Sequence, residues 1–160
     1  VLDETEVVGG VTTRVVEERE TEAGELIEIS RNFYAGTEDG TVCYFGEDVD
    51  IFENGRIVSQ EGAWRADAPG NFPGIIMPAN PRTGQTFPIE GAPGVAEDFG
   101  DVVAVNAPVD VPAGSFTRTV RIRETDPLEP DFDFKVFARD VGIVVDGPLS
   151  LVSFDVLDDP

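Results

Sequence analysis

Apolar and polar residues alternate along several stretches of this chain, with the period of two that is typical of a β-strand lying between a core and water. Ile27, Ile29 and Phe33 fall on one side of one such stretch, and the two phenylalanines of the run at 132–134 fall on one side of another. No stretch shows convincing helical periodicity. The pattern therefore predicts strands at 10–21, 25–35, 41–53, 56–66, 85–90, 101–111, 115–125, 131–138, 141–146 and 149–157.

Short turn sequences separate these runs. Asn54-Gly55 and Asp39-Gly40 are favoured two-residue hairpin turns, because both of their central residues tolerate a positive φ. Ala23-Gly24, Ala113-Gly114 and Asp146-Gly147 stand at similar junctions. Consecutive strands are therefore predicted to pair as antiparallel hairpins.

Residues 67–94 interrupt the pattern with six prolines and several glycines. Proline has no amide hydrogen to give to a ladder, so this segment is not expected to be a central strand. Its apolar centre, Gly74–Pro78, is predicted to plug a concave sheet. The fold class we predict is all-β: a long-stranded antiparallel meander forming a strongly curved sheet or partly open barrel, with a Pro/Gly-rich excursion at about 67–94, in a single domain over 1–160.

Acidic residues dominate the charge of the chain. There are 32 Asp and Glu against 11 Lys and Arg, which gives a formal net charge of −21. The acids are spread along the whole length, as in a charged folded surface, and such a surface repels nucleic acid. No apolar run is long enough to cross a membrane. Two interpretations stay open, a surface adapted to high salt and an ordinary secreted acidic protein.

The chain has no histidine and one cysteine, Cys43. The Ser-His-Asp and Cys-His arrangements of hydrolases and the usual Cys/His zinc site are therefore excluded. Cys43 is expected to be a small buried hydrophobe, since its charged sequence neighbours are acidic and a reactive thiol needs a positive environment. The composition leans against an enzyme without deciding the question.

One acidic cluster is a candidate cation site. Glu47, Asp48 and Asp50 lie on a predicted strand and Glu53 lies at its turn. Calcium takes several oxygen ligands, often carboxylates, so calcium is the cofactor these residues could hold. The alternative is a solvated strand face. A weaker candidate of the same kind is the acidic run at 129–133.

Aromatic side chains are the candidate ligand-binding residues. Phe33, Phe45, Phe116 and Phe134 are predicted to line a cavity for an apolar small molecule, and Trp64 is a candidate for stacking on a ligand. The alternative for all five is an ordinary hydrophobic core.

The arginines are the other candidate group. Either Trp64 is expected to pack against the proline-rich excursion, or Arg65 is expected to lie over an aromatic neighbour. Arg118, Arg121 and Arg123 share one predicted strand, with Arg121 and Arg123 on one face, and are expected to pair with carboxylates of neighbouring strands or to bind an anion.

Several landmarks occur together in one order along the chain. They are Tyr44-Phe45-Gly46-Glu47, Glu61-Gly62-Ala63-Trp64, Pro73-Gly74-Ile75-Ile76-Met77-Pro78, Pro81-Arg82-Thr83-Gly84, Ala92-Pro93-Gly94-Val95-Ala96-Glu97-Asp98, Val111-Pro112-Ala113-Gly114-Ser115-Phe116 and Pro127-Leu128-Glu129-Pro130. In these the chain resembles an uncharacterised family of secreted or lipoprotein-like microbial domains. The resemblance implies a secreted all-β domain with no known activity, in which strands before the equivalent of Val1 complete the sheet. The chain departs from the family pattern at Cys43, where members carry Trp, and at Gln60, where they often carry His.

Two functions follow as expectations. The first is a non-catalytic extracellular or cell-surface domain that acts by protein association, as a homo-oligomer or with a strand supplied by another chain. The second is a carrier-like module that holds an apolar small molecule or acyl chain in a curved sheet. Because the chain begins at Val1 rather than Met, it is expected to be a processed product or an excised fragment.

Overall fold

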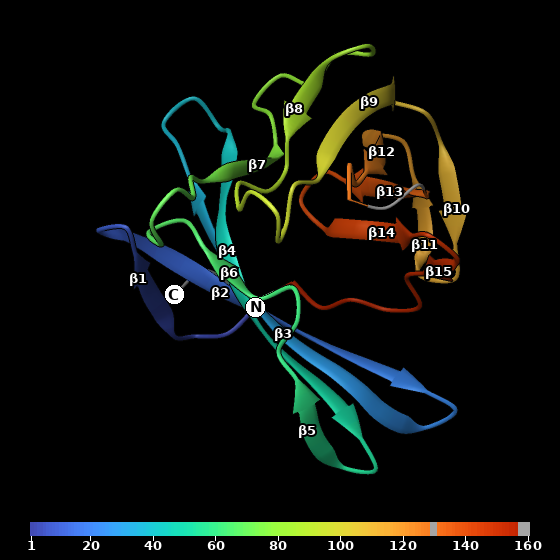
Figure 1. Ribbon diagram of the computed structural model, residues 1–160. Helices are drawn as coiled ribbons and strands as arrows, with labels where there is room; N and C mark the ends of the chain where they lie inside the picture. The colour runs from blue at the N-terminus through green and yellow to red at the C-terminus, as the bar shows by residue number, and fades with distance from the viewer. Residues whose placement is uncertain (129–130, 157–160) are drawn as a thin grey trace. The chain divides into compact units, whose positions relative to one another are not determined.

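All regular structure in the computed structural model is β-strand, over the residues it describes, 1–128 and 131–156 (Figure 1). Strands make up 58% and pair antiparallel, so the predicted all-β antiparallel class is confirmed. The strands are β1 (Thr5–Val8), β2 (Val11–Glu22), β3 (Glu25–Gly36), β4 (Val42–Glu53), β5 (Arg56–Ser59), β6 (Trp64–Arg65), β7 (Gly74–Met77), β8 (Thr86–Pro88), β9 (Phe99–Val105), β10 (Val109–Val111), β11 (Gly114–Phe116), β12 (Thr119–Thr125), β13 (Phe132–Ala138), β14 (Gly142–Asp146) and β15 (Leu149–Ser150).

The chain forms two compact units. Unit 1 comprises Val1–Asn80 and Pro88–Asp98, and unit 2 comprises Pro81–Phe87 and Phe99–Pro160. The proline-rich excursion is therefore divided between them. The expectation of one domain over 1–160 stays a prediction.

Unit 1 is one curved sheet. Its strand order is β1-β2-β3-β4-β5, with β6 and β7 also paired to β4, and it curls into a half-barrel (Figure 1). Strands β2, β3 and β4 have 12 residues each, which confirms the predicted long-stranded meander. Ala23 and Asn54 have positive φ values of 51° and 52° and precede positive-φ glycines, so Ala23-Gly24 and Asn54-Gly55 each close a two-residue hairpin. The prediction of a two-residue turn at Asp39-Gly40 is wrong, because β3 ends at Gly36 and β4 begins at Val42, and a longer loop joins them in which the Thr37 amide donates to the Thr41 carbonyl.

Strand β1 is missing from the predicted set. It pairs with the start of β2 through a turn at Gly9 and Gly10, whose φ values are 59° and 80°. The Gly9-Gly10 pair is itself a hairpin signal. The predicted strand at 10–21 includes Gly10, so the turn and the strand before it were missed.

The apolar centre of the excursion does not plug the sheet, so that part of the prediction is wrong. Gly74–Met77 forms β7, which extends the sheet by pairing with Val42–Tyr44 of β4. A Cβ on Gly74 would lie 1.8 Å from the carbonyl oxygen of Ile89, so only glycine allows the returning chain to pass there. The flanking prolines are tolerated because this short strand lies at the end of the pairing rather than between two long strands.

Unit 2 contains a sheet of order β15-β14-β13-β12-β9-β8 and a separate hairpin, β10-β11. Val136, Ala138 and Val144 form its buried cluster, and Val109 and Phe116 of the hairpin pack against that cluster. Two predicted strands are each divided here. The bend at Asn106–Pro108 separates β9 from β10, and Thr119 donates its hydroxyl to the carbonyl of Ala107 where β12 begins.

The last predicted strand, 149–157, is reduced to Leu149–Ser150 within the described residues, and residue 157 lies outside them. In the described part of the chain no helix is long and apolar enough to cross a bilayer.

The close approach of β6 to β4 gives a testable prediction. A Cβ on Gly46 would lie 2.2 Å from the carbonyl oxygen of Trp64, whereas a Cβ on Gly62 would meet nothing within 4 Å, and both glycines have a positive φ. We expect Gly62→Ala to cost about 1–2 kcal/mol of unfolding free energy through backbone strain alone. Gly46→Ala should cost at least about 2 kcal/mol more, because β6 must move away from β4. Urea unfolding of the two variants measures the difference, and equal losses would contradict the close approach.

Candidate functional site

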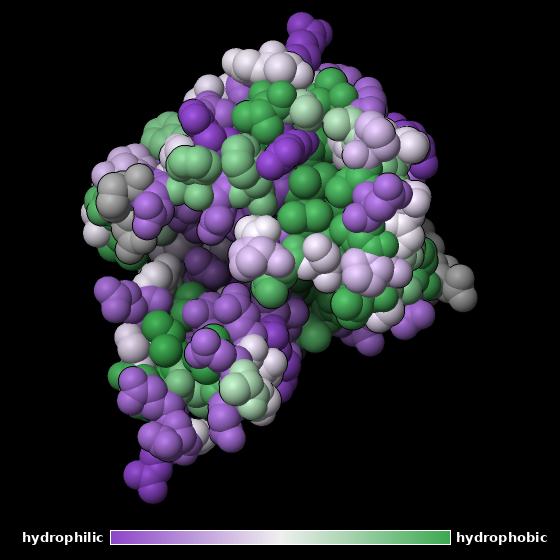
Figure 2. Space-filling model, turned by 90° about the vertical axis from the view of Figure 1, so that its right-hand side faces the viewer, coloured by the Kyte–Doolittle hydropathy of each residue, from purple (hydrophilic) through white to green (hydrophobic). Residues whose placement is uncertain are grey.

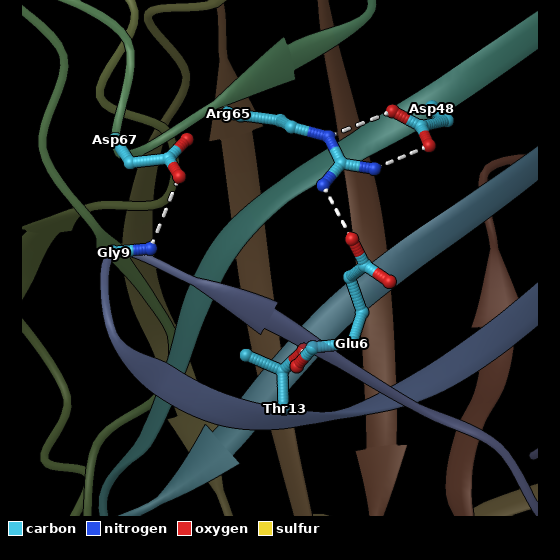
Figure 3. Close-up of polar contacts among 6 residues, drawn as sticks. All are labelled: Glu6, Gly9, Thr13, Asp48, Arg65 and Asp67. Atoms are coloured by element: carbon cyan, nitrogen blue, oxygen red, sulfur yellow. Dashed lines mark hydrogen bonds and ion pairs between the residues drawn. The ribbon is translucent and has the colours of Figure 1, made fainter.

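Arg65 is the centre of the densest polar network in unit 1 (Figure 3). Its Nε and Nη2 donate to the two carboxylate oxygens of Asp48 at 3.0 and 2.6 Å, and its Nη1 donates to Glu6 at 2.9 Å. Its guanidinium carbon lies 4.6 Å from the centre of the Phe33 ring, so the predicted cation–aromatic contact of Arg65 is present. The hydrogen bonds to Asp48, and then those to Glu6, raise the pKa of Arg65 further above its already high value, so the side chain stays charged.

Local backbone geometry brings Arg65 to this place. Gly46 lies opposite Arg65 in the β4–β6 pairing, and the absence of a side chain there lets the two strands approach. The neighbouring Gly9 amide donates to Asp67 at 3.2 Å, and the Thr13 hydroxyl donates to the Glu6 carbonyl at 2.9 Å. The bond to Asp67 ties the β1–β2 hairpin to the segment that carries Arg65, and the bond from Thr13 lies within the hairpin (Figure 3).

The four acidic candidates for calcium have separate environments. Asp48 pairs with Arg65, and Asp50 accepts a hydrogen bond from Gln60 at 2.8 Å. Glu47 lies opposite Trp64, and Glu53 is exposed opposite Arg56 at the hairpin end.

Among the described residues no three carboxylate or thiol side chains gather as a metal-holding group. Of the weaker candidate at 129–133, Asp131 and Asp133 are exposed and residue 129 lies outside the described residues.

The five aromatic candidates are distributed over both units. In unit 1, Phe33 is buried in a cluster with Val8 and Val15, and Phe45 packs against that cluster. Trp64 is also buried, with its ring edge-on to Tyr44 at 5.3 Å.

The remaining two aromatic candidates lie in unit 2. Phe116 packs against the buried cluster of that unit, and Phe134 lines a cavity. Within unit 1, Phe33 and Phe45 therefore serve as core side chains.

A buried polar group beside Trp64 is not foreseen from the sequence. The side-chain oxygen of Asn32 accepts hydrogen bonds from the hydroxyls of Tyr44 at 2.6 Å and Tyr34 at 3.4 Å. Desolvation raises the pKa of Tyr44 well above its ordinary value. Nε1 of Trp64 is the one buried side-chain polar atom without a hydrogen-bond partner among the described residues. The alternation of Asn32 and Tyr34 on one strand face is the signal that could have revealed this group.

The far ends of β2, β3 and β4 extend together with β5, away from β1, β6 and β7 (Figure 1). We call these residues, Glu17–Ile29 and Asp50–Ser59, the arm. None of them is buried, although the arm carries Ile27, Ile51 and Phe52. Leu26, Ile27 and Phe52 line a recess of about 500 Å³ at its tip, together with Glu25, Glu53 and Asn54.

Charge repulsion remains in the arm. Glu20 lies directly opposite Glu28 in the β2–β3 pairing, and Glu22 lies opposite Glu25. Like charges in directly opposed positions destabilise a sheet. Desolvation, followed by the charge of Glu20, raises the pKa of Glu28.

Apolar side chains reach the surface at several places. Figure 2 shows green apolar surface between purple hydrophilic side chains. Ile57 and Val58 in the arm and Phe132 in unit 2 are each more than half exposed. Cys43 is half-buried rather than fully buried, and desolvation raises the pKa of its thiol, which opposes reactivity.

The expected pairing with carboxylates is present for two of the three arginines at 118–123. Arg123 pairs with Asp101 at 2.6 Å, and Arg118 pairs with Asp140 at 3.2 Å. Arg121 instead places its guanidinium over the Phe134 ring at 4.2 Å, beside a cavity of about 300 Å³ in unit 2.

Comparison with models of protein families, with curated proteins and with solved structures gave no match. Function is therefore argued from the geometry and charge of the chain itself.

Removing the Arg65 side-chain charge tests the network. Arg65→Gln should lower the unfolding free energy by about 2 kcal/mol, because Glu6 and Asp48 lose charge-assisted bonds and Phe33 loses its cover. The matched control is Arg118→Gln, which removes a surface pair and should change stability by about 0.5 kcal/mol or less. Chemical denaturation measures both, and a loss no larger than that of the control would refute the role of Arg65.

Neutralising Glu28 tests the repulsion in the arm. Because the folded-state pKa of Glu28 is raised, ionisation of this group costs stability at neutral pH. Glu28→Gln should therefore raise the melting temperature by about 1–2 °C at pH 7. The gain should shrink as the pH falls through the raised pKa towards the ordinary value of 4.5, because the wild-type carboxyl then takes up its proton. Glu38→Gln, on an exposed turn, is the control; a gain for Glu28→Gln that persists undiminished at low pH would contradict the charge explanation.

Proposed function

We propose that this chain is a non-catalytic association domain, secreted or displayed at a cell surface, that binds a strand of another protein along β5. The observation that carries the proposal is the arm, in which isoleucine, leucine and phenylalanine side chains lie on strands without a single buried residue. Apolar side chains on a folded strand normally cover a core, and a group left uncovered is typical of an interaction surface.

The two open edges of the arm differ in composition. The β2 edge has the sequence Glu17-Glu18-Arg19-Glu20-Thr21-Glu22, and charges of this density discourage strand addition. The β5 edge carries Ile57 and Val58, which are 54% and 53% exposed. Strand order places β5 at the end of its row, so a partner strand can extend the sheet there.

Charge complementarity selects the kind of partner. With a net charge of −21, two copies of this chain repel each other at moderate ionic strength. We therefore propose a cationic strand from a different protein rather than a second copy.

The carrier-like alternative has support from one observation, the cavity beside Phe134 in unit 2. Its volume of about 300 Å³ is at the lower limit of small-molecule pockets. A cavity of that size favours a small ligand over a long acyl chain, so the association domain is the better-supported function.

A defined probe tests the proposal. A synthetic peptide that alternates lysine with valine and threonine should shift the backbone amide resonances of Arg56–Ser59 and leave those of Glu17–Glu22 unchanged. The same peptide with glutamate in place of lysine should bind much more weakly. Val58→Lys should abolish the shifts, whereas Val152→Lys, at an exposed position outside any strand, should leave them intact.

Three results would overturn the proposal. They are shifts confined to the β2 edge, equal binding of the cationic and anionic peptides, and no shift at millimolar cationic peptide. Sedimentation of the isolated protein provides the separate check on self-association. A concentration-dependent dimer that Val58→Lys abolishes would replace the foreign strand by a second copy.

A further inference from the structure

Unit 2 contains a cavity that the association function does not use. It has a volume of about 300 Å³ and lies where the hairpin residue Val109 faces the sheet of β12, β13 and β14. Three valines and Phe134 form its apolar wall, and Arg121 and Asp133 supply its charges. The lining residues are Val109, Arg121, Asp133, Phe134, Val136, Val145 and Gly147.

The size of the cavity limits the ligand. An apolar cavity of about 150 Å³ holds benzene, which has six non-hydrogen atoms. A cavity of twice that volume therefore accommodates about a dozen non-hydrogen atoms. The apolar wall is suited to an aromatic ring or a short hydrocarbon chain.

Arg121 is the polar group that orients the ligand. Two nearby arginines, Arg118 just before β12 and Arg123 on β12, each pair with a carboxylate. Over the residues described, no carboxylate lies within 4.0 Å of the Arg121 guanidinium, although acids outnumber bases in the chain by 32 to 11. Stacking on Phe134 holds one face of the guanidinium and leaves its N–H edge available for a bidentate acceptor.

Asp133 sets the charge that the ligand can carry. Its carboxylate approaches Gly147, where an added Cβ would lie 3.2 Å from Oδ1, so this acid stands at the border of the cavity. A second negative charge on the ligand would be repelled by Asp133. A single carboxylate placed against Arg121 keeps the attraction and limits the repulsion from Asp133 to that of one charge.

We propose that this cavity binds a small amphipathic monocarboxylate, with its carboxylate on the edge of the Arg121 guanidinium and its apolar part against Phe134 and the valines. This inference is independent of the strand partner at β5, since all lining residues belong to unit 2.

The test compares 3-phenylpropanoate with 3-phenylpropan-1-ol, which share an apolar part and differ in charge. Both are titrated into the full chain at fixed ionic strength and followed by amide chemical shifts. We expect the carboxylate to bind more tightly and to shift residues of β10, β12, β13 and β14. Arg121→Gln should weaken the carboxylate by about tenfold and change the alcohol by less than about twofold.

Two further variants separate binding from misfolding. Asp133→Asn should strengthen carboxylate binding by about two- to threefold, a gain that structural damage would not produce. Val109→Trp should fill the cavity and abolish binding of both compounds. Arg118→Gln is the matched control and should leave both affinities unchanged, since its partner Asp140 lies outside the cavity lining.

The proposal is overturned if the two compounds bind equally or if Arg121→Gln and Arg118→Gln have the same effect. It is also overturned if 3-phenylpropanoate does not bind at a concentration of 10 millimolar, about the weakest dissociation constant that a specific site of this size would have. Loss of binding in Asp133→Asn would likewise oppose it, because removing the acid should help the ligand.

Discussion

The close approach of β6 to β4 at Gly46 is the constraint on which unit 1 depends. It places Trp64 and Arg65 beside the long strands, where Trp64 is buried against Tyr44 and Arg65 covers Phe33. Through Glu6 and Asp48 the same guanidinium connects the first strand of the sheet to the fourth. Bidentate pairing with Asp48 fixes the plane of the guanidinium, which a lysine could not reproduce. Arg65 therefore holds the curved part of the sheet together. It can lie there because Gly46, opposite it on β4, has no side chain.

The arm begins where this network ends. Beyond Ser30 and Val49 the strands continue for several residues with neither buried side chains nor a balanced charge pattern. Opposed glutamates and exposed apolar side chains such as Ile57 are both costly in an isolated sheet. A partner strand along β5, as proposed above, would cover the apolar side chains of that edge. The cavity of unit 2 is of a different kind, since Arg121 there is stacked on Phe134 and has no carboxylate partner within the part of the chain that the structure describes.

Local signals in the sequence were enough for the class of fold, because each depends on neighbouring residues. The alternation along β3 and the turn at Asn54-Gly55 predict the hairpins of unit 1 without knowledge of distant contacts. The contact of Arg65 with an aromatic ring could also be predicted, because Arg65 lies on a predicted strand of a sheet that also carries aromatic residues. What could not be predicted depends on register between distant segments. The pairing of Gly74–Met77 with β4 and the separation of Phe33 from Phe134 both arise from which strands meet, and that information is spread over the chain.

Native-state hydrogen exchange of the isolated protein tests the central claim most directly. If the Gly46–Arg65 junction holds unit 1 and the arm is held only by its own ladder, amides of β4 at Tyr44–Asp48 should exchange by the slowest opening in unit 1. Amides at Glu20–Glu28 and Phe52–Ile57 should exchange at least about a hundredfold faster, through local opening that leaves the junction closed. Equal protection of the arm and the junction would show that the arm is a stable part of the core, and would contradict its assignment as an uncovered surface awaiting a partner.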